Sequence, residues 1–450
     1  MKTTLCWPLS LCLFLFTQNS KAAEFSSEQV IFRLKNSIAI KETNLLNAVT
    51  HTEELVPALG IYLGYKKNNV SIGETLRQLR EIKSVEYAVP DYEVSLRDMP
   101  NDPDFKLQWP LKNTVTPNAD IKATEAWNYS KGGQDVSGSD IVVAVVDGGI
   151  DILHEDLREN IWVNKTEIAA NGKDDDGNGY IDDVNGWNAF DDSGKLPRDA
   201  HATHVAGIVG ARGNNQIQVC GVNHQVKIMS VVGASGKTST VLKAYNYVLV
   251  QKKIWLESRG MKGANVVATN SSFGVDFADC KSNEYKPWND IYNLMGNYGI
   301  LSVAATINRN IDVDARGDVP TGCESESLIA VTNTDELDRL NTSSGYGIKS
   351  IDLGAPGTDV LSTVPGQSIM KMTGTSMATP YVAGAVALLH SAANRTFNDY
   401  YKSSPKEASL SLKKILLQNV DAIEALKDKS MSNGRLNLFK ATQAISQFNQ

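Results

Sequence analysis

The 450-residue sequence has little cysteine, no excess of positive charge and, after its first residues, no apolar run of membrane-spanning length. With a net charge of −7 and no Lys/Arg cluster it lacks a basic face, so we expect no nucleic-acid partner. The apolar run at Leu5–Phe16 has about a dozen residues, whereas a span needs about 20. The content of 42% hydrophobic and 21% charged residues is ordinary for a globular chain. We expect one large core and a smaller unit.

The first residues have the pattern of an export signal, with one lysine, the apolar run and small residues before Ala22. We therefore expect a signal peptide over residues 1–22 and a secreted protein, periplasmic or extracellular. Cys6 and Cys12 leave with this signal, so at most one intrachain disulfide can form among Cys220, Cys280 and Cys323. We expect Cys280–Cys323, although the sequence leaves the pairing open.

A stretch rich in Pro, Asp and Asn, residues 97–113, separates two regions of different pattern. Before it, residues 28–34 and 85–96 read as strands and residues 71–82 as a helix, which indicates a small α+β unit. We place a domain boundary in this stretch, between residues 23–98 and residues 99–450.

After the boundary, short apolar β-branched runs are separated by helix-like segments such as residues 239–258. The runs cover residues 140–147, 226–233, 264–274, 299–306 and 327–333. This alternation predicts a parallel sheet covered by helices on both faces, with its chemistry beyond the carboxyl ends of the strands. Residues 409–426 and 438–448 read as amphipathic surface helices.

Three polar residues stand where such a sheet places its chemistry. Asp147 ends an apolar strand, His201 lies at a loop-to-helix junction, and Ser376 precedes a helix whose N-terminus carries partial positive charge. A serine nucleophile needs an imidazole to take its proton and a carboxylate to stabilise the imidazolium. The chain order Asp, His, Ser argues against an α/β-hydrolase, in which the serine comes first within GxSxG.

The segments around these residues resemble the subtilisin-like serine peptidases, or subtilases, over almost the whole chain after the signal. VAVVDGGIDILHEDL (143–157) and HATHVAGIVGA (201–211) look like the family's Asp and His regions, and GTSMATPYVAGAVALL (374–389) its very specific Ser region. The resemblance implies a three-layer α/β subtilisin-like fold with a mostly parallel sheet. It also implies that residues 23–98, which end in a propeptide-like SVEYAVPDYEV, form a ferredoxin-like inhibitory propeptide.

The resemblance assigns Asp147, His201 and Ser376 as the catalytic triad and Asn308 as the side-chain donor of the oxyanion hole. Ile307 stands where the family has Gly, and a β-branched residue does not easily take the backbone angles that Gly allows. This departure leaves Asn310 open as an alternative donor, and the larger side chain is expected to affect the size of the adjacent substrate pocket.

Two milder departures lie close by. Ala202 replaces a usual Gly, and Gly148 stands where Ser or Thr is common. His204, three residues after His201, is read as a packed histidine, because a zinc site of the HExxH type needs a spacing of four with an intervening Glu.

A bound peptide is expected as an added strand between two exposed backbone edges. These edges are Ser272, Phe273 and Gly274 on one side and Gly233, Ser235 and Gly236 on the other.

Calcium is the expected cofactor. Oxygen-bearing side chains recur at every second residue of an acidic loop, as in calcium-binding loops: Asp174, Asp176, Asn178, Tyr180 and Asp182. The alternative is a solvated acidic loop without a metal. The resemblance implies a second calcium site from Asp156, Asn215, Ile217 and Val219.

The sequence thus predicts a secreted, calcium-stabilised serine endopeptidase, a monomer that cleaves proteins or peptides and carries its own propeptide as an intramolecular inhibitor. Two alternatives stay open. One is a catalytically impaired member of the fold that binds peptides without turnover, and the other is a serine esterase.

Overall fold

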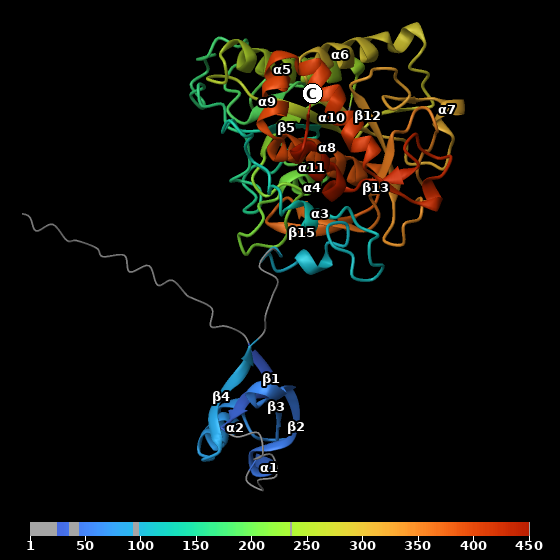
Figure 1. Cartoon of the computed structure of the whole chain (residues 1–450). Coiled ribbons are helices and arrows are strands. Elements are labelled where there is room, and N and C mark those ends of the chain that lie inside the picture. Colours follow the sequence, from blue (N-terminus) through green and yellow to red (C-terminus); the bar gives the residue numbers. More distant parts are fainter. Residues whose placement is uncertain (1–24, 36–44, 93–98, 235, 450) are drawn as a thin grey trace, which may run out of the picture. The chain divides into compact units, whose positions relative to one another are not determined.

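The computed structural model describes residues 25–35, 45–92, 99–234 and 236–449 (Figure 1). The predicted signal peptide, residues 1–22, lies outside them. The chain divides into two compact units, Met1–Arg97 and Asp98–Gln450, and the division falls in the stretch rich in Pro, Asp and Asn. No helix within the described ranges combines the length and the apolar character that crossing a membrane requires.

The first unit is a four-stranded antiparallel sheet with two helices. Its strand order is β2-β3-β1-β4, the order of a ferredoxin-like fold. Along the chain the elements are β1 (Phe25–Leu34), α1 (Leu45–Ala48), β2 (Val49–Val56), β3 (Ile61–Lys66), α2 (Ile72–Arg80) and β4 (Val85–Tyr92). The strand and helix predictions for β1, α2 and β4 are confirmed. The sequence pattern did not reveal β2, because Val49 is its only buried residue and it lacks an apolar alternation.

The second unit is built on a nine-stranded sheet in the order β16-β17-β13-β12-β10-β8-β5-β7-β6. Every neighbouring pair is parallel except β16 and β17. The strands are β5 (Val142–Asp147), β6 (Gly186–Asn188), β7 (Lys227–Val232), β8 (Val266–Ser271), β10 (Leu301–Ala305), β12 (Leu328–Thr334), β13 (Leu353–Pro356), β16 (Asp421–Ala422) and β17 (Gly434–Arg435). The mostly parallel sheet predicted from the apolar runs is confirmed.

Helices cover both faces of this sheet and make a three-layer fold. Because side chains alternate along a strand, Val143 and Val145 of β5 pack in one core and Val142 and Ala144 in the other. The first core includes α4 (Ala200–Gly210) and α8 (Thr375–Ala392), and the second includes α5 (Thr238–Glu257) and α6 (Lys286–Asn297). All strand residues of β5 are therefore buried, and the chemistry is confined to the strand end.

Short elements complete the second unit. Two small antiparallel sheets pair β9 (Val275–Asp276) with β11 (Asp318–Val319) and β14 (Val360–Val364) with β15 (Ser368–Met372). The remaining helices are α3 (Ala123–Ala126), α7 (Val313–Arg316), α9 (Arg395–Ser403), α10 (Pro405–Gln418) and α11 (Leu438–Ser446). A disulfide joins Cys280 to Cys323 as expected, and Cys220 is buried and free.

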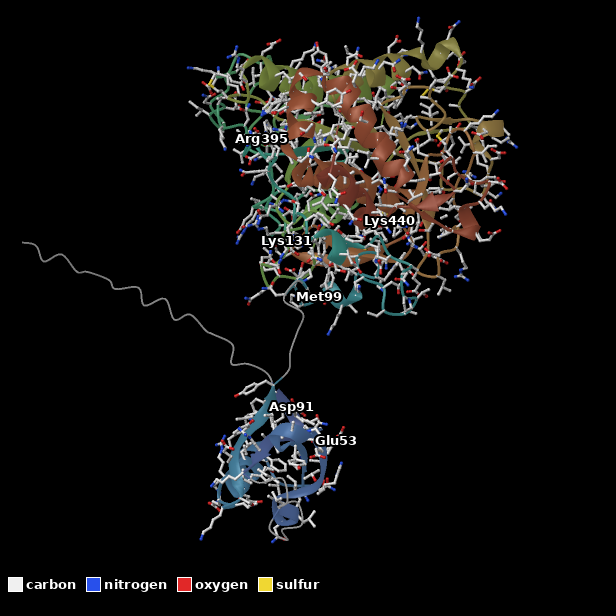
Figure 2. All side chains as sticks on the ribbon, viewed as in Figure 1. Glu53, Asp91, Met99, Lys131, Arg395 and Lys440 are labelled. Carbon is white, nitrogen blue, oxygen red and sulfur yellow. A yellow bond between two sulfur atoms is a disulfide. The ribbon has the colours of Figure 1, made fainter. Side chains whose placement is uncertain are left out.

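The predicted helix over residues 409–426 is too long. It ends at Gln418, because the carboxylate of Asp421 pairs with the buried guanidinium of Arg435 at 2.8 Å and its backbone joins β17. The predicted α11 is amphipathic, with Leu438 buried and Lys440 exposed to solvent (Figure 2).

Candidate active site

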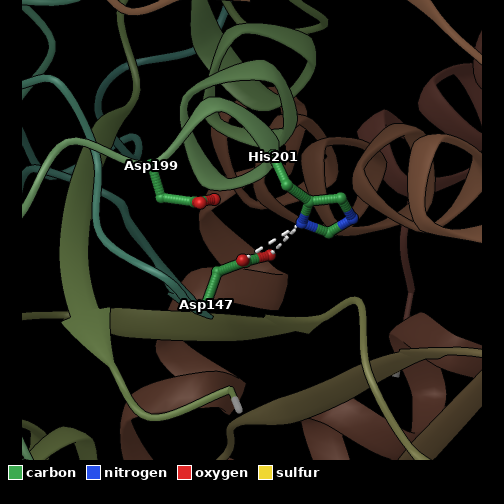
Figure 3. Close-up of side chains that lie close together, drawn as sticks. All are labelled: Asp147, Asp199 and His201. Carbon is green, nitrogen blue, oxygen red and sulfur yellow. Dashed lines mark hydrogen bonds and ion pairs between the residues drawn. The ribbon is translucent and has the colours of Figure 1, made fainter.

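Asp147 and His201 come from the carboxyl end of β5 and the first turn of α4, and they contact each other directly (Figure 3). Nδ1 of His201 lies 3.0 and 3.1 Å from the two carboxylate oxygens of Asp147. The Asp147 carboxylate is buried and also accepts the backbone NH of Gly148 at 2.7 Å, whereas the His201 side chain is 38% exposed. With Nδ1 held in this way, Nε2 of His201 is left for proton transfer.

A second carboxylate, that of Asp199, lies beside this pair. Ligand atoms of Asp147, Asp199 and His201 all lie within 4.8 Å of one another. Burial opposes the protonation of His201, but the hydrogen bond and charge of Asp147 and the charge of Asp199 outweigh it, so the pKa of His201 is raised. Sequence reasoning missed Asp199, although its place directly before a helix is typical of the N-cap it forms with the NH of Ala202 at 2.8 Å.

The close approach of Asp199 explains the glycine at position 148. A Cβ on Gly148 would lie 2.8 Å from the carboxyl carbon of Asp199, closer than real Cβ contacts. A serine or threonine there would therefore push Asp199 away from the imidazole of His201.

Ser376 is the second residue of α8, where the helix N-terminus places partial positive charge. Its Oγ donates to the carbonyl of Ser272 at 3.4 Å, and Oγ of Ser272 donates to the carbonyl of Ser376 at 3.0 Å. The described residues include no hydrogen bond between Ser376 and His201. Catalytic hydrogen bonds are often long before a substrate binds.

Asn308 follows the carboxyl end of β10 and is fixed by the residue before Ser376. Its Oδ1 accepts the backbone NH of Thr375 at 2.9 Å and the Thr375 hydroxyl at 3.0 Å. Since these bonds occupy only the oxygen, the amide NH2 of Asn308 is free to donate, and it has no partner in the described part of the chain. Sequence reasoning missed the role of Thr375, and no such contact ties Asn310 to α8.

Ile307 does not take a left-handed backbone conformation, so the strain expected from replacing a glycine is absent. Its NH donates to the carboxylate of Asp318 at 3.0 Å. Its side chain is buried in a small apolar cluster with Val313, Ala330 and Ile351.

The two predicted substrate edges follow β8 and β7, the strands on either side of β5 in the sheet. Ser272, Phe273 and Gly274 continue from β8, and Gly233 follows β7 with its NH donating to the carbonyl of Asp147 at 3.0 Å. Gly236 has a φ of +144°, and a Cβ there would lie 2.8 Å from the ring of Phe190. Ser235, between them, lies outside the described residues.

Comparison with known proteins decides the family to which this arrangement belongs. Residues 138–438 match the family model described as "Subtilase family". The chain belongs to the subtilase family. Subtilisin-like protease 1 of Plasmodium falciparum is 31% identical over 274 residues, which cover 55% of this subtilase and 37% of the relative. The thermophilic serine proteinase of Bacillus sp. (strain AK1) is 31% identical over 334 residues, covering 72% of this chain and 69% of the relative.

Solved structures show the same fold. Proteases from Pseudoalteromonas arctica superpose with a TM-score of 0.54 at 25% identity, covering 77% of this subtilase and 99% of the matched chain. The epidermin leader peptide processing serine protease of Staphylococcus aureus gives a TM-score of 0.55 at 18% identity, covering 94% of this subtilase and all of the matched chain. This subtilase spans little more than a third of the length of the first Plasmodium relatives.

His204 is a packed histidine in this subtilase, in keeping with the sequence interpretation. It is fully buried, and its Nε2 lies 2.9 Å from the carbonyl of Val360 and 3.0 Å from that of Met370. Burial lowers the pKa of His204 to about 4, so it stays neutral at ordinary pH.

The acidic loop of the subtilase gathers carboxylates, but not quite the predicted set. Ligand atoms of Asp174, Asp176 and Glu167 lie within 4.8 Å of one another. The amide of Asn178 donates to Asp176 at 3.2 Å and to Asp183 at 3.0 Å. Glu167 gave no sequence signal, because it lies several residues before the loop and reaches it only through the fold.

Two predicted ligands of this loop have other partners. The carboxylate of Asp182 accepts the NH groups of Asn171 and Gly172 at 3.0 and 3.2 Å and stands outside the carboxylate group. The Tyr180 hydroxyl accepts the amide of Asn246 at 3.0 Å, which leaves its main-chain carbonyl as the atom that could bind a cation. Such a set of hard oxygen donors suits calcium.

The second predicted site is centred on Asp156, which is fully buried. The Asn215 amide donates to it at 2.8 Å and the Val219 NH at 3.0 Å, while Oδ1 of Asn215 accepts the Ile217 NH. Burial raises the pKa of Asp156 to about 7, and the nearby charge of Asp102 contributes. Two buried carboxylates without a cation form a costly arrangement, so their chemistry fits a bound divalent cation.

Proposed function

We propose that this subtilase is a secreted serine endopeptidase that cleaves peptide bonds through an acyl-enzyme intermediate. The observation that supports the proposal is a pair of side chains, His201 and Asn308, that are each held at one atom and free at another. His201 is held by Nδ1 on Asp147, which leaves Nε2 for the serine hydroxyl. Oδ1 of Asn308 accepts hydrogen bonds from Thr375, which leaves the amide NH2 of Asn308 to donate to an oxyanion.

In the proposed reaction, Oγ of Ser376 attacks the peptide carbonyl carbon while Nε2 of His201 takes the hydroxyl proton. Asp147 stabilises the imidazolium that forms. The oxyanion accepts hydrogen bonds from the Asn308 amide and the backbone NH of Ser376. Collapse of the tetrahedral intermediate expels the amine, which receives the proton from His201. A water molecule then repeats the sequence and releases the acid and free Ser376.

The substrate enters as an extended strand between Ser272–Gly274 and Gly233–Gly236, and we propose protein or peptide substrates for this reason. Residues 1–22 act as the export signal and residues 23–98 as a propeptide that occupies the cleft of the peptidase domain, residues 99–450, before it is removed. The ferredoxin-like order of the first unit supports this assignment. The enzyme acts as a monomer outside the cytoplasm.

Calcium is proposed as a structural cofactor at two places. The acidic loop would offer Asp174, Asp176, Glu167, the Asn178 side chain and the Tyr180 carbonyl. The second site would offer Asp156 and the Asn215 side chain with the carbonyls of Ile217 and Val219, joined by Asp102.

A fluorophosphonate probe tests the proposal. Wild type should be labelled and should hydrolyse casein, whereas Ser376→Ala should do neither and Ser411→Ala, a serine on α10, should behave as wild type. Labelling without hydrolysis of any protein substrate would favour the esterase alternative. Absence of labelling after removal of residues 23–98 would favour a peptide-binding protein without turnover.

A further inference from the structure

Asp318, the first residue of β11, is a buried carboxylate that the proposed mechanism does not use. Asp318 is 1% exposed, and no Lys, Arg or His within the described ranges forms an ion pair with its carboxylate. Burial raises the pKa of Asp318 to about 6, and the neighbouring charge of Asp276 acts in the same direction. A buried charge without a counterion is unfavourable, and a cationic group from a ligand would offset this cost.

One side of Asp318 adjoins the predicted substrate edge. β11 pairs antiparallel with β9, and in that register Asp318 is opposite Asp276. β9 directly continues the edge Ser272–Gly274. A Cβ on Gly274 would collide with the carbonyl of Val319, so β11 lies immediately against this edge.

The other side of Asp318 adjoins the oxyanion donor. Its Oδ2 accepts the NH of Ile307 at 3.0 Å and the hydroxyl of Thr306 at 3.2 Å, and the hydroxyl of Thr321 also donates to it. Thr306 and Ile307 directly precede Asn308 in the chain. Oδ1 of Asp318, in contrast, has no hydrogen-bond partner among the residues that the structure describes.

The carboxylate therefore lies between the two segments that flank the nucleophile. A substrate whose carbonyl oxygen reaches Asn308 and whose backbone lies on Ser272–Gly274 must project the side chain of that same residue, P1, between these segments. The charged neighbour of Asp318 there is Asp276, whose own ion pair with Arg309 at 3.4 Å is exposed.

We propose that Asp318 selects a lysine or arginine at P1, the residue on the acyl side of the cleaved bond. The inference rests on the proposed function and names its substrate class. The cation of the side chain pairs with Oδ1, while Oδ2 stays bound to the segment that leads into Asn308. The same Oδ2 contacts give Asp318 a second effect, since they hold the backbone before the oxyanion donor.

The test distinguishes selection of the substrate by the charge of Asp318 from a structural role of its hydrogen bonds. Fluorogenic peptides that differ only at P1 carry Arg, its neutral isostere citrulline, Lys or Leu, and kcat/KM is measured for the full-length protein after it has processed itself. Asp318→Asn keeps an oxygen acceptor for Oδ2's partners and removes the charge. Asp276→Asn is the matched control, because it removes a neighbouring exposed charge.

Wild type should prefer Arg and Lys over citrulline and Leu, and Asp318→Asn should reduce the Arg/citrulline ratio by about 30-fold or more, the loss typical of a buried charge pair. Asp276→Asn should change this ratio by less than about threefold, as expected for an exposed charge. An equal loss on all four peptides in Asp318→Asn would make Asp318 a scaffold residue and overturn the inference. So would a wild type that cleaves citrulline and arginine peptides equally. Absence of cleavage of every peptide together with absence of probe labelling would instead refute the proposed function itself.

Discussion

The burial of Asp156 leads to an unusual prediction. Replacing this proposed calcium ligand should stabilise the protein when calcium is removed. The native pKa of Asp156 is about 7 and the ordinary value is 3.8. At pH values between 3.8 and about 7, the Asp156 carboxyl is protonated in the native state and ionised in the unfolded state. The unfolded state therefore binds fewer protons, and stability falls as pH rises through this window.

The magnitude follows from the pKa difference. About three pKa units correspond to about 4 kcal/mol of unfolding free energy that is lost at pH 8 and fully present below pH 4. Calcium bound at the proposed site would reverse the effect, because it would supply the counterion that the buried carboxylate lacks.

Urea unfolding of the Ser376→Ala protein, which lacks the proposed nucleophile, measures this effect without self-digestion. In EDTA at pH 8, adding Asp156→Asn should raise the free energy of unfolding by up to about 4 kcal/mol, and at pH 4 it should leave it nearly unchanged. In excess calcium at pH 8 the same substitution should lower it. A variant that is less stable than its parent in EDTA at pH 8, or a difference that does not depend on pH, would refute the reasoning.

Three further predictions concern single contacts. Asn308→Ala should lower kcat by about 10²–10³-fold with little change in KM, the loss known for such a donor in subtilisin itself, and an unchanged kcat would remove Asn308 from the oxyanion hole. Asp199→Asn removes a charge that helps to raise the pKa of His201, so the acid limb of the kcat/KM–pH profile should move to lower pH; a limb that stays in place would contradict this role. Replacing Cys280 and Cys323 by Ala should lower the free energy of unfolding by about 4 kcal/mol, from the chain-entropy model for a separation of 43 residues, and an unchanged urea midpoint would argue against it.

The family and the main elements were predictable because their signals are local. The run that forms β5 is apolar throughout and ends in Asp147, so both the strand and the position of the carboxylate follow from a few consecutive residues. The same holds for α2, which buries Ile72, Leu76 and Leu79 at helical spacing. Short or exposed elements such as β2 lack such a signal.

Ile307 shows a different limit of prediction from the sequence. The sequence showed only that it stands where the resemblance leads one to expect glycine, and the expected strain followed from that comparison. The structure shows an ordinary backbone whose NH is bound by Asp318. The backbone NH of Ile307 is bound by a carboxylate from β11, a separate element 11 residues further along the chain.

By itself, the sequence determined the alternation of strands and helices, the family, and the three polar residues proposed as a triad, because periodicity and short motifs are carried by neighbouring residues. Only the tertiary structure brought Asp199 to Asp147, Glu167 to the acidic loop and Asp318 to the segment before Asn308. Each of these contacts depends on the strand order or on how the loops between strands fold against one another. No local pattern records that order, so the electrostatics around a buried carboxylate became visible only in the folded chain.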